Sequence, residues 1–282
     1  MLEPVLDGST MHAGAAFPAA TCTLDEAFVD AYLAATGETH ALYARGYAPS
    51  LCLILVRFSK TSLGGRWPSG TLQLDQRFRS LRALRRGECL TLDLRIGSVG
   101  ERNGRPQLEM LTTVRDEHDL IVAELGSHSS WPQNTGLGLK VAGAAPAPPR
   151  PAPEADAPTE TRIGPLTDRF PMARLKAYGE VAGARDPIHL DPDFARTTPL
   201  GVNIAQGKLV MTLLSRLMLE HLGERWLHSG FLDIRFRRPV PVGAEVQAWA
   251  SPVAGGDATQ FSVWITDEHG ERVIAGKAGL TA

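Results

Sequence analysis

One short segment of this chain concentrates side chains that could transfer protons. Within eight residues it contains one histidine and three aspartates, Asp186, His189, Asp191 and Asp193. A carboxylate beside an imidazole raises the pKa of the ring and orients it, which is how an acid–base pair is built. We therefore expect His189 to be a catalytic group with Asp186 as its partner.

A structural interpretation of the same residues is also open. A loop histidine can bond to a neighbouring carboxylate or to the backbone, and an aspartate before a proline, as at Asp186, often bonds to its own backbone. Asp191 and Asp193 are expected to cap the short helical turn that residues 192–196 would form.

A second feature follows, where the sequence I-A-Q-G at 204–207 opens an apolar helix. A helix N-terminus offers unpaired N–H groups and the positive end of the helix dipole. Gly207 has no side chain to block close approach, so its N–H could hold an oxyanion. The alternative for Gly207 is simple close packing.

These features together carry a family resemblance. D-P-I-H-L-D-P-D-F-A at 186–195, followed by I-A-Q-G, resembles the hydratase motif of the MaoC-like, (R)-specific enoyl-CoA hydratases. F-R-R-P-V at 236–240 with Gly243 resembles a strand and turn of that family. The resemblance covers about residues 165–282. It implies a hotdog fold and the reversible addition of water across a trans-2-enoyl thioester, giving a (3R)-hydroxyacyl product.

The sequence departs from the family pattern at the catalytic pair. The family's aspartate, five residues before the histidine, is Ala184 here, and its asparagine, three before, is Asp186. Only His189 therefore carries over as a catalytic group, and Asp186 is our own candidate for the missing partner. Gln206 replaces a family histidine, a change expected to affect packing more than chemistry.

Other residues could bind the substrate. Ser215 falls at the family's spacing and could face the substrate, although a serine inside a helix usually bonds back to a carbonyl of the preceding turn. Arg237 and Arg238 form a basic cluster with Arg235, which suits either a coenzyme A phosphate or a solvated sheet edge. His40, the first-half counterpart of His189, is expected to be non-catalytic.

The elements that must position these residues repeat along the chain, helices first and strands after. The sequence T-L-D-E at 23–26 predicts a capping box with Thr23 as N-cap, and Gly37 should end that helix. The other expected elements are helices at about 50–60, 171–182 and 205–221, and strands at about 70–80, 88–97, 107–115, 119–130, 230–238, 244–254, 258–267 and 271–281.

This order predicts an α+β tandem, or double, hotdog fold, with antiparallel sheets each wrapped around a central helix. We expect a degenerate N-terminal hotdog domain at 1–135, a Pro/Ala-rich linker at 136–161 and a MaoC-like hotdog domain at 162–282. Six prolines within residues 141–160 support the linker, because such a segment forms neither helix nor ladder. The first half should contribute part of an acyl tunnel.

The amino-acid composition and net charge exclude some classes of partner. The 282 residues are 43% hydrophobic and 21% charged, with a net charge of −2. A nucleic-acid protein usually shows a basic excess, so nucleic acid is not expected as a partner. The most apolar stretch, 204–222, is too polar to span a membrane. The three cysteines form no C-x-x-C pair and no signal peptide is evident. We expect a cytoplasmic protein with no metal and no cofactor.

The main hypothesis is thus a lyase, a hydratase or dehydratase acting on thioesters of coenzyme A or acyl carrier protein in fatty acid or polyketide metabolism. One alternative is a non-catalytic hotdog subunit that binds acyl thioesters or a partner hydratase, which Ala184 favours. A hotdog thioesterase is another. Further pairing into a homodimer is compatible with all three.

Overall fold

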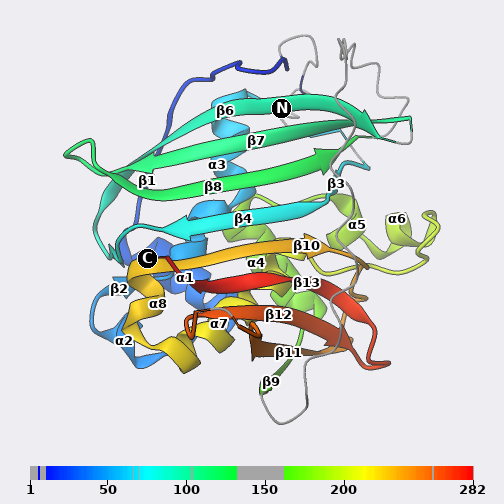
Figure 1. The fold of residues 1–282 in the computed structure, drawn as a ribbon. Helices are drawn as coiled ribbons and strands as arrows, with labels where there is room; N and C mark the ends of the chain where they lie inside the picture. The colour runs from blue at the N-terminus through cyan, green and yellow to red at the C-terminus, as the bar shows by residue number, and fades with distance from the viewer. Residues whose placement is uncertain are drawn as a thin grey trace.

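All strands except β2 (Tyr47–Ala48) and β5 (Leu84–Arg85) lie side by side in one layer, with helices packed on one face (Figure 1). The computed structural model describes residue 6 and residues 11–65, 67–68, 70–102, 104–131, 162–255 and 257–281. Within these residues, eleven strands form one sheet in which neighbours pair antiparallel, in the order β1-β6-β7-β8-β4-β10-β13-β12-β11-β9, with β3 paired to β8. Their bounds are β1 Ala20–Thr23, β3 Leu72–Gln73, β4 Asp75–Ser80, β6 Cys89–Arg102, β7 Arg105–Arg115, β8 Ile121–Ser130, β9 Ile163–Arg169, β10 Gly230–Phe236, β11 Glu245–Pro252, β12 Gln260–Asp267 and β13 Arg272–Leu280.

The two halves of the chain have the same strand order. The first reads β1-β6-β7-β8-β4 from edge to centre, and the second reads β9-β11-β12-β13-β10. The two sheets join where β4 pairs antiparallel with β10, placing Phe78 opposite Leu232. The predicted tandem hotdog fold is confirmed, with its two sheets continuous. The predicted linker, 136–161, lies outside the described residues, so the domain limits stay a prediction.

The central helix of the second half is α7 (Gly207–Leu222), close to the predicted 205–221. Its side chains are buried nearly all round because it packs against β9, β11, β12 and β13. Its C-terminal neighbour is α8 (Glu224–Ser229), which packs against β4, β10 and β13. Among the described residues, no helix is both long and apolar enough to cross a membrane.

The corresponding segment of the first half is shorter and broken. The single helix predicted at 50–60 is wrong: a 3-10 helix η2 (Ser50–Ile54) is followed by α3 (Val56–Leu63). Leu55 between them is extended, at φ −64° and ψ 142°. At this break the carbonyl oxygen of Ile54 accepts a hydrogen bond from Lys208 Nζ of α7, 2.7 Å away. A contact between the halves therefore coincides with the interruption.

The helix before this segment, α1 (Glu26–Thr36), ends at Gly37 in the left-handed region, as predicted. The predicted N-cap is wrong. Thr23 ends strand β1 opposite Cys89, and Asp25 caps the helix by accepting from the Phe28 amide at 2.8 Å. The carboxylate takes this place because the helix begins at Glu26, two residues later than the capping box requires, so Asp25 directly precedes it.

Small elements complete the fold and connect the halves. α1 packs against α4 (Met172–Ala182), where the guanidinium of Arg174 donates to the Ala35 carbonyl at 3.0 Å. The remaining elements are α2 Ala41–Ala44, α5 Pro187–Leu190, α6 Pro192–Arg196, and a separate strand pair of β2 Tyr47–Ala48 with β5 Leu84–Arg85.

Candidate active site

The loop that carries the expected catalytic pair begins where α4 ends. Gly183 closes α4 in the left-handed region, and Pro187 opens α5. Asp186 caps α5, because its Oδ1 accepts from the Ile188 amide at 3.1 Å. Among the described residues, no hydrogen bond joins the Asp186 carboxylate to the ring of His189. The structure thus places the two residues one turn apart with only a charge interaction between their side chains.

His189 is half-buried, and hydrogen bonds hold both its backbone and its ring. Its backbone N–H donates to the Asp186 carbonyl at 2.9 Å, and its ring Nδ1 lies 2.9 Å from the Ile204 carbonyl oxygen. A carbonyl oxygen only accepts, so Nδ1 carries the hydrogen and Nε2 of the neutral ring has a lone pair. Burial lowers the pKa of His189, and the Ile204 bond and the Asp186 charge oppose that effect. This arrangement suits a base at neutral pH.

A residue that the sequence did not single out, Asn203, fixes the loop to the strand-like segment before α7. Its buried amide donates to the Ile188 carbonyl at 3.0 Å and to the Asp191 carbonyl at 3.1 Å. The Ile204 amide also donates to Ile188, at 3.3 Å. A lone polar residue between Val202 and Ile204 was the available signal. Asn203 therefore positions His189 against Ile204.

Gly207 is the first residue of α7, and its amide has no acceptor among the described residues. A Cβ on Gly207 would lie 3.0 Å from Cε1 of Phe236 at the end of β10. The neighbouring Gln206 is buried, and its Nε2 donates to the carbonyls of Leu175 at 3.0 Å and Ala184 at 3.4 Å. Gln206 thus ties α4 and the loop after it to the start of α7, a packing role.

The other predicted site residues lie apart from this centre. Ser215 is about 12 Å along the helix axis from Gly207 at 1.5 Å per residue, and its Oγ accepts from Trp226 Nε1 at 3.0 Å. Arg237 and Arg238 line an open hollow at the turn before β13, where Arg238 pairs with Glu271 at 2.9 Å. His189 contacts Ile204, three residues before Gly207, whereas Ser215 lies about two turns further along α7.

The predicted cap of residues 192–196 is confirmed for Asp191, whereas Asp193 pairs with Arg196. Asp191 Oδ1 caps α6, accepting from the amides of Asp193 at 2.9 Å and Phe194 at 3.2 Å. His40 caps α2 through its Nδ1, which accepts from the Leu42 amide at 3.2 Å. Within the described ranges, no group of three or more His, Cys, Asp or Glu side chains is placed to hold a metal ion.

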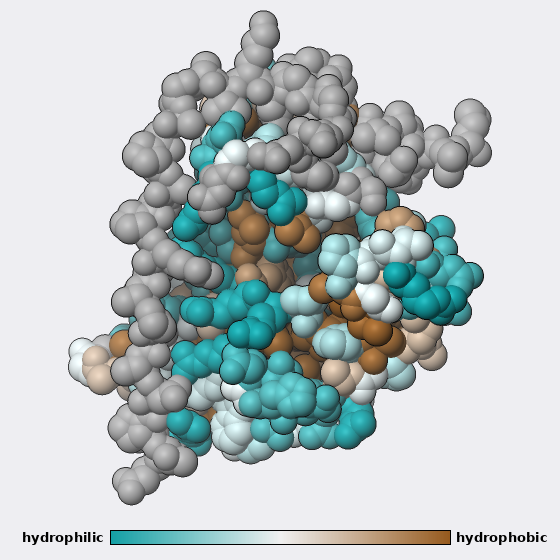
Figure 2. Space-filling model, turned by 90° about the vertical axis from the view of Figure 1, so that its right-hand side faces the viewer, coloured by the Kyte–Doolittle hydropathy of each residue, from teal (hydrophilic) through white to brown (hydrophobic). Residues whose placement is uncertain are grey.

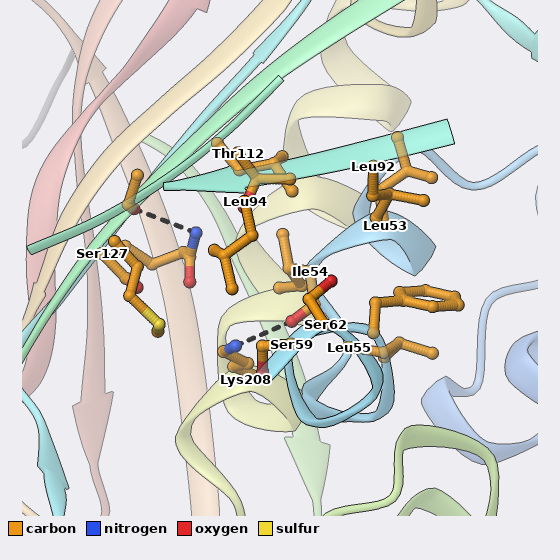
Figure 3. A pocket seen from close by; sticks show the side chains of 15 residues that line it. Leu53, Ile54, Leu55, Ser59, Ser62, Leu92, Leu94, Thr112, Ser127 and Lys208 are labelled. Carbon is orange, nitrogen blue, oxygen red and sulfur yellow. Dashed lines mark hydrogen bonds between the residues drawn. The ribbon is translucent and has the colours of Figure 1, made fainter. Parts of the chain in front are cut away.

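A pocket partly open to solvent lies beside η2 and α3 (Figure 3). Its cavity volume is about 40 Å³, and its total empty space, open solvent included, is about 450 Å³. All but one of its lining residues come from the first half: Leu53, Ile54, Leu55, Phe58, Ser59, Ser62, Gln76, Leu92, Leu94, Met110, Thr112, Leu125, Gly126 and Ser127. The exception is Lys208, which directly follows Gly207. The pocket therefore adjoins the start of α7.

The side of the molecule with β3 and α6 exposes hydrophobic residues. Figure 2 shows hydrophobic side chains reaching the surface between hydrophilic regions. Leu72 of β3 and Leu200 and Val202, in the loop after α6, are between 45% and 49% exposed. This side of the molecule presents an apolar surface near the loop of His189.

Comparison with known proteins gives the following similarities. Residues 150–273 match the family described as MaoC like domain. The chain is 32% identical over 96 residues to 3-hydroxyacyl-thioester dehydratase Z of Mycobacterium tuberculosis, covering 33% of this chain and 64% of that protein. It is 37% identical over 84 residues to the (R)-specific enoyl-CoA hydratase of Aeromonas caviae, covering 29% and 62%. The chain thus spans just under two thirds of the length of these relatives.

The whole chain also resembles a solved structure. The MaoC-like dehydratase from Phytophthora capsici superposes over 96% of each chain with a TM-score of 0.73 at 17% identity. At that identity the likeness shows the fold, and it extends over both halves.

Proposed function

Because the second half of the chain is a MaoC-like domain, we propose that the protein adds water reversibly to trans-2-enoyl thioesters, or removes it from (3R)-hydroxyacyl thioesters. One observation carries the proposal. The Ile204 carbonyl holds Nδ1 of His189, and three residues later the amide of Gly207 opens α7 without an acceptor in the described part of the chain. A base and an oxyanion donor thus share one short segment.

The proposed reaction balances as follows. Nε2 of His189 takes a proton from water as the water oxygen bonds to C3, and the thioester oxygen gains enolate charge beside the Gly207 amide. The protonated ring of His189 then gives its proton to C2, the thioester carbonyl re-forms and the neutral ring is regenerated. Asp186 raises the proton affinity of the ring through its charge. Removing one oxyanion donor in other enzymes costs on the order of 10²–10³ in rate.

The thioester's two ends would go to different parts of the molecule. The acyl chain would enter the pocket beside η2 and α3, because Lys208 joins that pocket to Gly207. The phosphates of coenzyme A or of a carrier protein's prosthetic arm would lie on Arg237 and Arg238. A cytoplasmic location, a homodimer and a place in fatty acid or polyketide metabolism are parts of the same proposal.

A second candidate function is a non-catalytic subunit that binds acyl thioesters or a partner hydratase. Two observations favour it: Ala184 stands where the family has an aspartate, and the Asp186 carboxylate caps α5. The experiment must therefore test separately whether the protein turns over enoyl thioesters and whether His189 and Asp186 act as a catalytic pair.

We would follow the loss of enoyl-thioester absorbance with a short and a medium-chain trans-2-enoyl-CoA, for wild type, His189→Ala and Asp186→Asn. Exposed His118→Ala is the matched control. Hydration by wild type with most of the rate lost in both variants supports the proposal. Full activity of Asp186→Asn would remove Asp186 from the pair.

Two outcomes would replace the hydratase proposal. Inert wild type, with both coenzyme A and carrier-protein substrates, would make the chain a binding subunit. Release of free thiol without a hydroxyacyl product would make it a thioesterase, the alternative that the sequence left open.

A further inference from the structure

The pocket beside η2 and α3 has one charged group, placed at its junction with the site. Among its fifteen lining residues only Lys208 is ionisable, and no Asp or Glu is present. Nζ of Lys208 has one hydrogen-bond acceptor within the described part of the chain, the Ile54 carbonyl oxygen at 2.7 Å. An ammonium has three donors. Two therefore remain for a ligand.

Hydroxyls and an amide accompany this amine along an otherwise aliphatic wall. Ser59, Ser62, Thr112, Ser127 and Gln76 line the same pocket, and Figure 3 shows Lys208 reaching from α7 toward Ile54. Ser62 and Ser127 are both 5% exposed. Ser59 Oγ donates to the Val56 carbonyl at 2.9 Å, and Gln76 Nε2 donates to the Gly126 carbonyl at 3.1 Å. A plain hydrocarbon chain would cover the other hydroxyls, those of Ser62, Thr112 and Ser127, without replacing their hydrogen bonds to water, which is unfavourable.

We propose that the acyl chain bound in this pocket carries a carboxylate, which pairs with Nζ of Lys208 while the Ser62 hydroxyl donates to its second oxygen. The inference rests on the proposed function, since it names the substrate class of the same site. An anionic ligand would compensate the one positive charge that the pocket's own residues leave without a counter-ion.

The pKa of Lys208 makes the proposed carboxylate binding depend on pH. Burial lowers it from 10.5 to about 8. The amine is therefore mostly charged at pH 7 and mostly neutral at pH 9, and a carboxylate ligand should bind more weakly at the higher pH.

The competing explanation is structural. Lys208 could serve only to join α7 to η2 through the Ile54 carbonyl. Such a clamp would stabilise the protein and affect every acyl ligand equally, whereas a carboxylate site changes the preference between ligands.

The test uses saturated acyl-CoA probes, which bind without turnover. Affinities are measured by calorimetry for ω-carboxyacyl-CoA esters of four to eight carbons and for unsubstituted esters of the same lengths. At pH 7 wild type should prefer the carboxylated member of at least one pair by about tenfold or more. Lys208→Met should lose or invert this preference, and the preference should decline between pH 7 and 9.

Two further variants keep the test decisive. Lys208→Gln keeps a donor for Ile54 without charge and should also lose the preference. Exposed Lys176→Met on α4 should keep it. Equal affinity for both probes in wild type, or an equal loss for both in Lys208→Met, would overturn the proposal.

The outcomes also separate this inference from the proposed function. A failure to hydrate enoyl-CoA leaves the binding comparison intact. Binding of neither probe class by wild type would overturn the carboxylate site even if hydration is observed. A fall in kcat for every enoyl substrate in Lys208→Gln, with the binding preference unchanged, would assign Lys208 to catalysis and overturn it as well.

Discussion

The protonation of His189 depends on opposing effects that a measurement can separate. Burial lowers the pKa of the ring below 6.5, and the Asp186 charge raises it. If neutral Nε2 is the base, kcat/KM should be constant above pH 7 and fall at acid pH with a slope of one. Asp186→Asn keeps the cap on Ile188 but removes the charge, so the acid limb of its remaining activity should move to lower pH. A limb that stays in place would contradict the charge interaction.

Glu38, in the first half of the chain, is a buried carboxyl with no role in the proposed chemistry. Burial raises its pKa from 4.5 to about 7, although Tyr43 donates a hydrogen bond to it. A carboxyl with a raised pKa stabilises the fold below its unfolded pKa, and that contribution is lost as pH rises through about 7. The loss amounts to up to about 3 kcal/mol.

Glu38→Gln should remove this dependence. Its unfolding free energy relative to wild type should therefore increase between pH 5 and pH 8, as measured by urea unfolding at each pH. Exposed Glu220→Gln on α7 is the control and should show no such change. An equal effect of Glu38→Gln at both values would contradict the assignment.

Ser215 is predicted to stabilise the fold. Ser215→Ala would leave Trp226 Nε1 buried without its acceptor, which should cost about 1–3 kcal/mol. The KM for enoyl-CoA should not change. Thermal unfolding and hydration kinetics check the two statements, with Ser229→Ala, at an exposed hydroxyl, as control. An increase in KM with unchanged stability would restore the substrate-facing role.

At the scale of elements, the start of α7 lies tightly against the end of β10. Gly207→Ala would place Cβ 3.0 Å from Cε1 and 3.1 Å from Cδ1 of Phe236. The helix start must shift, and displacing a catalytic donor by about 1 Å can cost about 10²-fold in rate. Adding Phe236→Leu should make room and restore most of the rate relative to Phe236→Leu alone. A double variant that stays inactive would show that the Cβ blocks the substrate itself.

The sequence predicted the long elements well because their patterns are local. Alternation along β6, where Leu90, Leu92, Leu94 and Ile96 are buried, is visible without tertiary contacts. The short edge strands β1 and β9 were missed because pairing alone defines them. The cap at Asp25 was misplaced for the same reason: it depends on where β1 ends.

The candidate site was predictable to a similar extent. The motif identified His189 and Gly207 as candidate site residues, and the spacing of the motif alone was sufficient to select them. Asn203, Gln206 and Lys208 act through carbonyls of Ile188, Leu175 and Ile54, which are distant in sequence. No pattern within the chain reveals such partners, so these positioning roles required the structure.

At the scale of the whole molecule, the β4–β10 pairing should make the two halves unfold together. Phe78, 3% exposed, lies at this junction opposite Leu232. Single-tryptophan variants that retain Trp131 in the first half or Trp264 in the second should show the same urea midpoint. Phe78→Ala should lower both midpoints together, because it should reduce the free energy of unfolding by about 3–5 kcal/mol. Two separate midpoints would show independent domains.

The repeated strand order also affects how this protein can evolve. In a symmetric dimer of two identical hotdog domains, each substitution appears in both domains. A change that reshapes the pocket in one domain therefore also alters the domain that supplies the reactive loop. Here the pocket walls at 53–127 and the loop at 186–207 occur once each, in different halves of one gene. Under the proposed function, substitutions in the first half can reshape the pocket around Lys208 while leaving His189 and its supports untouched, and a library confined to the first half is the natural place to engineer acyl-chain preference.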